Sequence, residues 1–210
     1  NGDDDEEAPT TGGTDGQLNG EDHQLFCAKA LCNLGCHNGS EKKIVDEGGV
    51  RALMMICMVR AVKQFTKQVC AKALLNLLND ENLVELLEAD LVKVIATLSK
   101  KPPLPKKEDE TLLKVCAEIF LKLSASDIGR KELISRQVTL ESVFNLMRSK
   151  DVQTQSMTGK TACNLLAFED SQAAGVKAGA VLVLKHMCLD LEEGIKEQCA
   201  LSFFLVCRKE

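Results

Sequence analysis

The residues of this chain best suited to bind a ligand recur at one spacing. Three lysines are each followed, four residues later, by an asparagine. The lysines are Lys29, Lys72 and Lys160, and the asparagines are Asn33, Asn76 and Asn164. Residues four apart share one face of a helix. A lysine ammonium attracts carboxylates, and a side-chain amide both donates and accepts hydrogen bonds, so together they favour recognition of an acidic, extended peptide.

Other chemistry has little support in the sequence. The three histidines, at positions 23, 37 and 186, have no nucleophile and acid at a spacing that would form a catalytic set. The segment 159–161 (Gly-Lys-Thr) resembles the end of a phosphate-binding loop, but Thr154 stands where that loop needs a glycine. We therefore expect no enzymatic activity and no cofactor.

Ten cysteines are spread along the chain, and four of them, at positions 27, 70, 116 and 199, occupy one register of a repeated phrase. A shared register predicts small, buried core side chains. The one tight group is Cys32, Cys36 and His37, whose spacing lacks the paired C-x2-C pattern of zinc sites, so we expect no metal. Unpaired cysteines favour a reducing compartment, here the cytoplasm, with nuclear or organelle-surface association left open.

Composition narrows the class of partner. The chain has 210 residues, 45% of them hydrophobic, with a net charge of −5 and neither tryptophan nor tyrosine. Nucleic-acid-binding domains are usually basic on one face and offer aromatic platforms for bases, so nucleic acid is not the expected partner. No apolar run reaches the roughly 18 residues of a membrane span, so we expect none.

The elements that carry these residues form a repeat. One phrase occurs at residues 27–34, 70–77, 116–123, 158–165 and 199–206, with steps of 41–46 residues. Self-similarity at this period is typical of an α-solenoid, which stacks helical units in one line. The first unit predicts a long helix over 21–36, a short helix over 41–47 capped by Ser40, and a medium helix over 50–59 that begins after Gly48 and Gly49.

The ends and one insertion have a different composition. Residues 1–20 are acidic and poor in large apolar side chains, which predicts a disordered tail; its acidic residues 3–7 could also act as an internal ligand of the lysines. Residues 21–210 are expected to form about four and a third units, part of a longer array, with a proline-containing loop inserted at 100–110. The apolar last helix, with Phe203 and Phe204, could make end-to-end contacts with a second copy.

The three-helix unit, the glycines before the medium helix and the Asn-Leu pair of the long helix together resemble the armadillo repeat family. The stretch 31–54 is similar to units of β-catenin and of vacuolar scaffolds. The resemblance implies an all-α, right-handed solenoid whose long helices line a groove, with Asn33, Asn76 and Asn164 bonding a ligand backbone and Lys122 in the third unit's place. Lys29, Lys72 and Lys160 stand where nuclear import receptors of the family carry tryptophan.

The sequence thus predicts a non-enzymatic scaffold that binds an extended, acidic segment of a partner protein. The predicted contacts are Lys29, Asn33, Lys72, Asn76, Lys122, Lys160 and Asn164. Two alternatives stay open: a transport or adaptor receptor for a protein cargo, and a structural armadillo protein of an axoneme or organelle surface.

Overall fold

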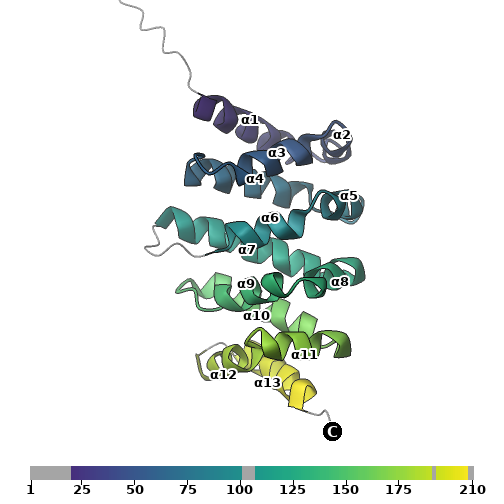
Figure 1. The fold of residues 1–210 in the computed structure, drawn as a ribbon, viewed down its shortest axis with the longest axis vertical. Coiled ribbons are helices and arrows are strands. Elements are labelled where there is room, and N and C mark those ends of the chain that lie inside the picture. The colour runs from purple at the N-terminus through teal and green to yellow at the C-terminus, as the bar shows by residue number, and fades with distance from the viewer. Residues whose placement is uncertain (1–19, 101–106, 191–192, 208–210) are drawn as a thin grey trace, which may run out of the picture.

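A computed structural model describes residues 20–100, 107–190 and 193–207. That part of the chain contains thirteen helices and no strand (Figure 1). The long helices are α1 (Gly20–Leu34), α4 (Gln64–Leu77), α7 (Lys107–Ala125), α10 (Val152–Leu166) and α13 (Glu193–Cys207). The short helices are α2 (Glu41–Asp46), α5 (Leu83–Glu88), α8 (Asp127–Ser135) and α11 (Glu169–Lys177). The medium helices are α3 (Gly49–Met58), α6 (Leu91–Leu98), α9 (Gln137–Leu146) and α12 (Ala180–Asp190).

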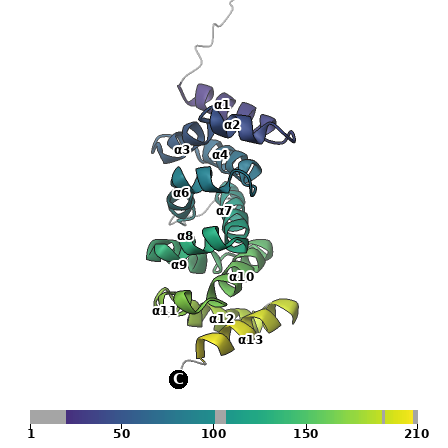
Figure 2. The ribbon, with the colours of Figure 1, turned by 90° about the vertical axis from the view of Figure 1, so that its right-hand side faces the viewer.

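The helices stack in layers along one line (Figures 1 and 2). Each long helix packs on the next, in the order α1, α4, α7, α10 and α13, and the medium helices α3, α6 and α9 also pack in sequence. The short helices cover one edge of the stack. Every unit therefore contacts mainly its neighbours, which is the arrangement that defines a solenoid.

A left-handed residue joins the short helix to the medium helix in three of the four units. Gly48 has φ 81°, Asp90 has φ 69° and Gly179 has φ 102°. This conformation ends one helix and turns the chain directly into the next, and glycine adopts it without steric cost. The third unit instead uses Arg136 in an extended conformation between α8 and α9.

Small residues of the repeated phrase lie between successive long helices. Cys70, Cys116 and Cys199 are fully buried, as the repeat register predicts. Cys27, at the same register in α1, is exposed, since within the described residues no long helix comes before α1 to cover it. The next phrase position is also small and buried in the second and third units, at Ala71 and Ala117. Such small residues let neighbouring helices approach closely. The sequence phrase therefore recurs because each long helix packs on the next.

Several sequence-based expectations need correction. Ser40 precedes α2, but its side chain makes no capping hydrogen bond, since its backbone is already in the helical region. The helical spacing of Met54, Met55 and Met58 in the sequence favours core positions for all three; Met54 is buried, whereas Met55 is 72% exposed and Met58 46% exposed. Residues 107–110, predicted to be loop, begin α7. The expected tail, residues 1–19, and most of the expected loop, residues 101–106, lie outside the described residues.

Candidate partner-binding face

The predicted lysines lie on one face of the stacked long helices. Lys29 on α1, Lys72 on α4, Lys122 on α7 and Lys160 on α10 all have exposed side chains. We call the solvent-facing side of these helices the long-helix face. Among the residues that the structure describes, Lys72 and Lys160 form no ion pair, so their charges are available to a ligand.

Lys29 lies over an aromatic ring of the next unit. Its Nζ is 5.7 Å from the centroid of the Phe65 ring, within the range of a cation–π contact. Phe65 is the second residue of α4 and is 44% exposed. The contact joins a positive charge and an exposed apolar surface at the boundary between the first two units.

Asn76 binds the end of the preceding long helix. Its Nδ2 donates to the carbonyl oxygen of Cys32 at 3.2 Å and to Sγ of Cys36 at 3.1 Å. The last carbonyl groups of a helix have no partner inside the helix and need one from elsewhere. Asn76 therefore satisfies the C-terminal end of α1 and fixes the second unit against the first.

In the next two units, the residue at the same repeat position also donates a hydrogen bond to the end of the preceding long helix. Nζ of Lys122 donates to the carbonyl oxygen of Leu78, just after α4, at 3.4 Å. Nδ2 of Asn164 donates to Oγ of Ser124, near the end of α7, at 3.0 Å. Asn33 lies on α1, the first helix of the described residues, and its side chain is exposed.

The predicted asparagines therefore differ from the predicted lysines in burial and in hydrogen bonding. Asn76 and Asn164 are half-buried and use part of their donor capacity within the protein. Each amide keeps its Oδ1 acceptor, which has no protein partner in the part of the chain that the structure describes. The structure brings all seven predicted residues to the long-helix face, but only the lysines and Asn33 are fully exposed there.

Lys72 also acts on the thiols beneath the long-helix face. Burial raises the pKa of Cys32, the neighbouring Cys36 raises it further, and the positive charge of Lys72 opposes both effects. The net result is a pKa above the ordinary value, so Cys32 stays a neutral thiol at pH 7. In the described residues no group of three or more histidine, cysteine, aspartate or glutamate side chains is placed to hold a metal ion.

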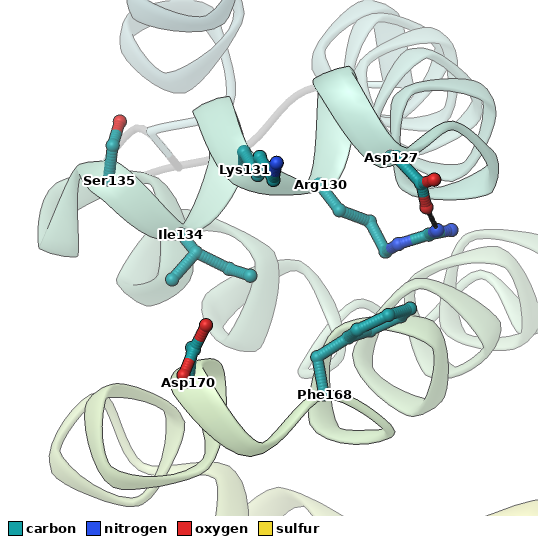
Figure 3. A pocket seen from close by; sticks show the side chains of 7 residues that line it. All are labelled: Asp127, Arg130, Lys131, Ile134, Ser135, Phe168 and Asp170. Atoms are coloured by element: carbon teal, nitrogen blue, oxygen red, sulfur yellow. Dashed lines mark hydrogen bonds and ion pairs between the residues drawn. The ribbon is translucent and has the colours of Figure 1, made fainter.

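Three clefts lie elsewhere, along the edge formed by the short helices. Figure 3 shows one of about 450 Å³ between α8 and the start of α11. Ile134 and Phe168 line it, and the Asp170 carboxylate points toward Ile134. A second, of about 630 Å³, lies between α5 and α8, and a third, of about 480 Å³, between the end of α1 and α2. No motif of the sequence predicted these clefts.

Arg130 closes one side of the cleft in Figure 3. Its guanidinium carbon is 4.3 Å from the centroid of the Phe168 ring, and its Nη1 donates to the carbonyl oxygen of Ser124 at 2.9 Å. A second amino group pairs with Asp127. Arg130 therefore uses both terminal amino groups to join α7 and α8 and stacks on Phe168 of the fourth unit, which is a structural role.

The walls of the other edge clefts are also internally paired. Arg136 binds Asp90 at 2.9 Å and Glu132 at 3.1 Å, and Lys42 on α2 binds Glu85 on α5. These ion pairs connect successive short helices. On the short-helix edge, Arg136 and Lys42 are therefore already paired with acidic side chains. Lys72 and Lys160 on the long-helix face have no such partner among the described residues.

Comparisons with known proteins give the fold and leave the family membership open. No protein-family model matches the sequence, and no curated protein sequence matches it either. No helix within the described part of the chain has the length and apolar character needed to cross a bilayer.

Solved structures match well along most of the chain. A computationally designed armadillo repeat protein is 15% identical with a TM-score of 0.71, covering 85% of this chain and 73% of its own. A designed armadillo repeat protein in complex with the peptide (KR)4 is 14% identical, with a TM-score of 0.69 and coverage of 90% and 77%. An engineered protein from the Northeast Structural Genomics Consortium is 21% identical, with a TM-score of 0.71 and coverage of 89% and 74%. The predicted fold class, an all-α solenoid of armadillo repeats, is confirmed.

Proposed function

We propose that this chain is a non-enzymatic scaffold that binds an extended, acidic segment of a partner protein across the long-helix face. One observation carries the proposal. Exposed lysines lie on four consecutive long helices, in a chain whose net charge is −5. In α7 the lysine is Lys122, at the asparagine register, and Glu118 stands at the lysine register. Because the chain as a whole is acidic, a basic row on one face is a local feature that selects carboxylates over amines.

The spacing of the helices sets how a ligand would match the row. Packed helices lie about 8–10 Å apart, and an extended chain advances about 3.3 Å per residue. A peptide that crosses the long helices therefore passes about three residues for each unit. The matching ligand carries a carboxylate at about every third residue, and about twelve residues cover the four lysines.

Phe65 supplies an apolar contact next to the first lysine. Its ring is 44% exposed and is already stacked under Nζ of Lys29. Exposed lysine–carboxylate pairs contribute only about 0–1 kcal/mol each, so charge alone gives weak binding. An apolar ligand residue placed over Phe65 adds hydrophobic burial, and the favoured ligand is therefore acidic with an apolar residue near one end.

The asparagines add hydrogen bonds to the backbone of the proposed ligand. Asn76 and Asn164 already donate to the preceding unit, and their Oδ1 atoms remain open as acceptors. We expect them to accept N–H groups of the ligand backbone, which gives affinity that does not depend on the ligand's sequence. Asn33 is exposed, and we expect its side-chain amide both to donate to and to accept from the ligand backbone.

The receptor alternative calls for a basic or otherwise distinct cargo. The designed protein in complex with (KR)4 shows that a protein of this architecture can accept a basic peptide. Here the lysines oppose such a ligand through like-charge repulsion. A basic peptide that binds the long-helix face more tightly than an acidic one would favour the receptor function.

A pull-down compares the wild type with the triple variant Lys29→Glu, Lys72→Glu, Lys160→Glu. A matched variant, Lys93→Glu, Lys131→Glu, Lys185→Glu, makes the same charge change at exposed lysines of the short and medium helices. Partners lost from the first variant and kept by the second support the proposal. Loss from both variants, or from neither, contradicts it, provided that circular dichroism shows intact helices in each.

One further observation favours self-association as a second function. Leu201 and Phe204 on α13 are 59% and 58% exposed, so the last helix presents apolar surface. Phe203 is half-buried against the core and is not available. Analytical ultracentrifugation of the wild type and of Phe204→Asp tests it. A concentration-dependent oligomer that Phe204→Asp abolishes supports end-to-end contact, and a monomer at all concentrations excludes it.

A further inference from the structure

A pair of cysteine side chains joins the last two long helices. Cys163 lies on α10 and Cys199 on α13, two helices that pack directly on each other. The Cys199 thiol is hydrogen-bonded to Cys163. Cys199 is fully buried, whereas Cys163 is only partly buried and packs at the margin of the core. Cys163 is therefore the more accessible residue of the pair.

The surroundings of Cys163 favour its thiolate. The hydrogen bond from Cys199 lowers the pKa of Cys163, burial opposes this, and a hydrogen bond from Ser202 lowers it further, to about 7. The same contact raises the pKa of Cys199, with burial acting in the same direction. Since the thiolate is the nucleophile in cysteine chemistry, Cys163 attacks and Cys199 holds the proton.

A second cysteine pair provides a contrast within the same chain. Cys57 on α3 and Cys70 on α4 are also hydrogen-bonded to each other. Both are almost completely inaccessible, at 2% and 0% exposure. The hydrogen bond with Cys70, together with burial, strongly raises the pKa of Cys57. This pair has the contact without the accessible thiolate, and it is expected to resist oxidation.

We propose that Cys163 is a peroxide-sensitive site and that it forms a reversible disulfide with Cys199, which links α10 covalently to α13. The disulfide joins the fourth repeat to the last long helix and fixes the C-terminal end of the long-helix face, one residue away from Asn164.

The chemistry takes two steps with hydrogen peroxide as the oxidant. The Cys163 thiolate attacks one peroxide oxygen, the O–O bond breaks, and Cys163 becomes a sulfenic acid while hydroxide leaves and takes up a proton. Cys199 sulfur then attacks the sulfenic sulfur, the S–O bond breaks, and water leaves with the Cys199 proton. Two thiols and one peroxide thus give one disulfide and two waters, and a dithiol reductant reverses the reaction.

The test treats the folded, reduced chain with limiting hydrogen peroxide, blocks the remaining thiols with iodoacetamide and maps disulfides by mass spectrometry. The expected result is a Cys163–Cys199 disulfide that forms at least tenfold faster than any Cys57–Cys70 disulfide. Its rate should rise with pH through about 7, following the thiolate fraction of Cys163. Absence of this disulfide, or equal rates for the two pairs, overturns the proposal.

Two variants separate the two steps. Cys199→Ser should leave Cys163 as a sulfenic acid that dimedone traps, because the second sulfur is missing. Cys163→Ser should abolish both dimedone labelling at this site and the disulfide. Preferential oxidation of the exposed Cys27, Cys36 or Cys207, with Cys163 unmodified, also overturns the proposal. Because the main experiment uses the wild type, the test stands even where a variant folds poorly.

Discussion

The two roles of the repeated asparagine can be separated by changing it in two different units. Asn76→Ala removes the amide that donates to the carbonyl oxygen of Cys32 at 3.2 Å and to Sγ of Cys36 at 3.1 Å. Asn33→Ala removes the same amide at the same register of α1, where the side chain is exposed and has no hydrogen-bond partner among the described residues. Asn76→Ala should therefore loosen α1 from α4, and Asn33→Ala should leave stability unchanged.

The magnitude follows from the number of contacts. An intramolecular hydrogen bond contributes about 1 kcal/mol net, and Asn76→Ala removes those to the Cys32 carbonyl and the Cys36 sulfur, which gives about 1–2 kcal/mol. The Cys32 carbonyl keeps the Cys36 thiol as a donor, so no larger loss is expected. A substitution at an exposed site without a partner changes stability by less than about 0.5 kcal/mol, which is the expectation for Asn33→Ala. A loss of 1–2 kcal/mol accelerates local opening by about 5–30-fold.

Hydrogen exchange measured by mass spectrometry resolves the effect by helix. The amides near the C-terminal ends of α1 and α4, where Asn76 makes its contacts, should exchange faster in Asn76→Ala. Those of α10 and α13 should keep their wild-type rates, because units of a solenoid contact mainly their neighbours. Equal effects of the two substitutions, or an effect spread evenly over the chain, would refute the assignment of Asn76 to the joint between units.

Further predictions concern helix starts and pH. Ser126 accepts a hydrogen bond from Gly129 N at 3.0 Å at the start of α8, so Ser126→Ala should cost about 1 kcal/mol in urea unfolding, whereas Ser40→Ala, which removes no capping bond, should cost much less. Asp151 accepts from Thr154 at the start of α10, and this hydrogen bonding holds the pKa of Asp151 below its ordinary value. Its stabilising contribution is complete above that ordinary value, about 3.9, and is lost as the pH falls through the depressed pKa. Asp151→Ala should therefore destabilise the protein more at pH 7 than at pH 3, and an equal loss at both values would contradict the reasoning.

Much of the fold could be predicted because the repeat spacing and the glycine punctuation are local signals. The medium helix α3 spans Gly49–Met58, within one residue of the predicted 50–59 at each end. The burial of Cys70 and Cys116 followed from their shared register alone. These features depend on contacts that every unit makes with its neighbours, and the sequence repeats them.

The rest depends on where a residue stands within the whole array. Cys27 has the register of a core cysteine but lies in the first unit, so it is exposed. Met55 and Met58 follow helix spacing, yet the core side of α3 is already filled by residues such as Leu53 and Met54. The burial of such residues depends on neighbours that are distant in sequence, so it cannot be predicted from periodicity.

The candidate site shows the same division. The common face of the lysines could be predicted from a spacing of four residues on helices that repeat. The donation by Asn76 to the end of α1 could not, because it requires knowing which helix ends pack beside each asparagine. The thiol contact between Cys163 and Cys199 likewise arises only when α10 and α13 stack.

The sign of charge that the long-helix face prefers can be measured by peptide binding. Fluorescence anisotropy would compare two labelled peptides of about twelve residues, identical except that glutamate stands at about every third position in one and lysine in the other. We expect the wild type to bind the glutamate peptide more tightly and to lose that binding as salt is raised toward 1 M.

The triple variant Lys29→Glu, Lys72→Glu, Lys160→Glu should reverse the preference. Each reversal turns a weak attraction into a similar repulsion, about 1 kcal/mol per site, so the glutamate peptide should bind about a hundredfold more weakly. The control variant Lys93→Glu, Lys131→Glu, Lys185→Glu should bind like the wild type. Tighter binding of the lysine peptide by the wild type, or the same loss in both variants, would contradict the proposed acidic partner.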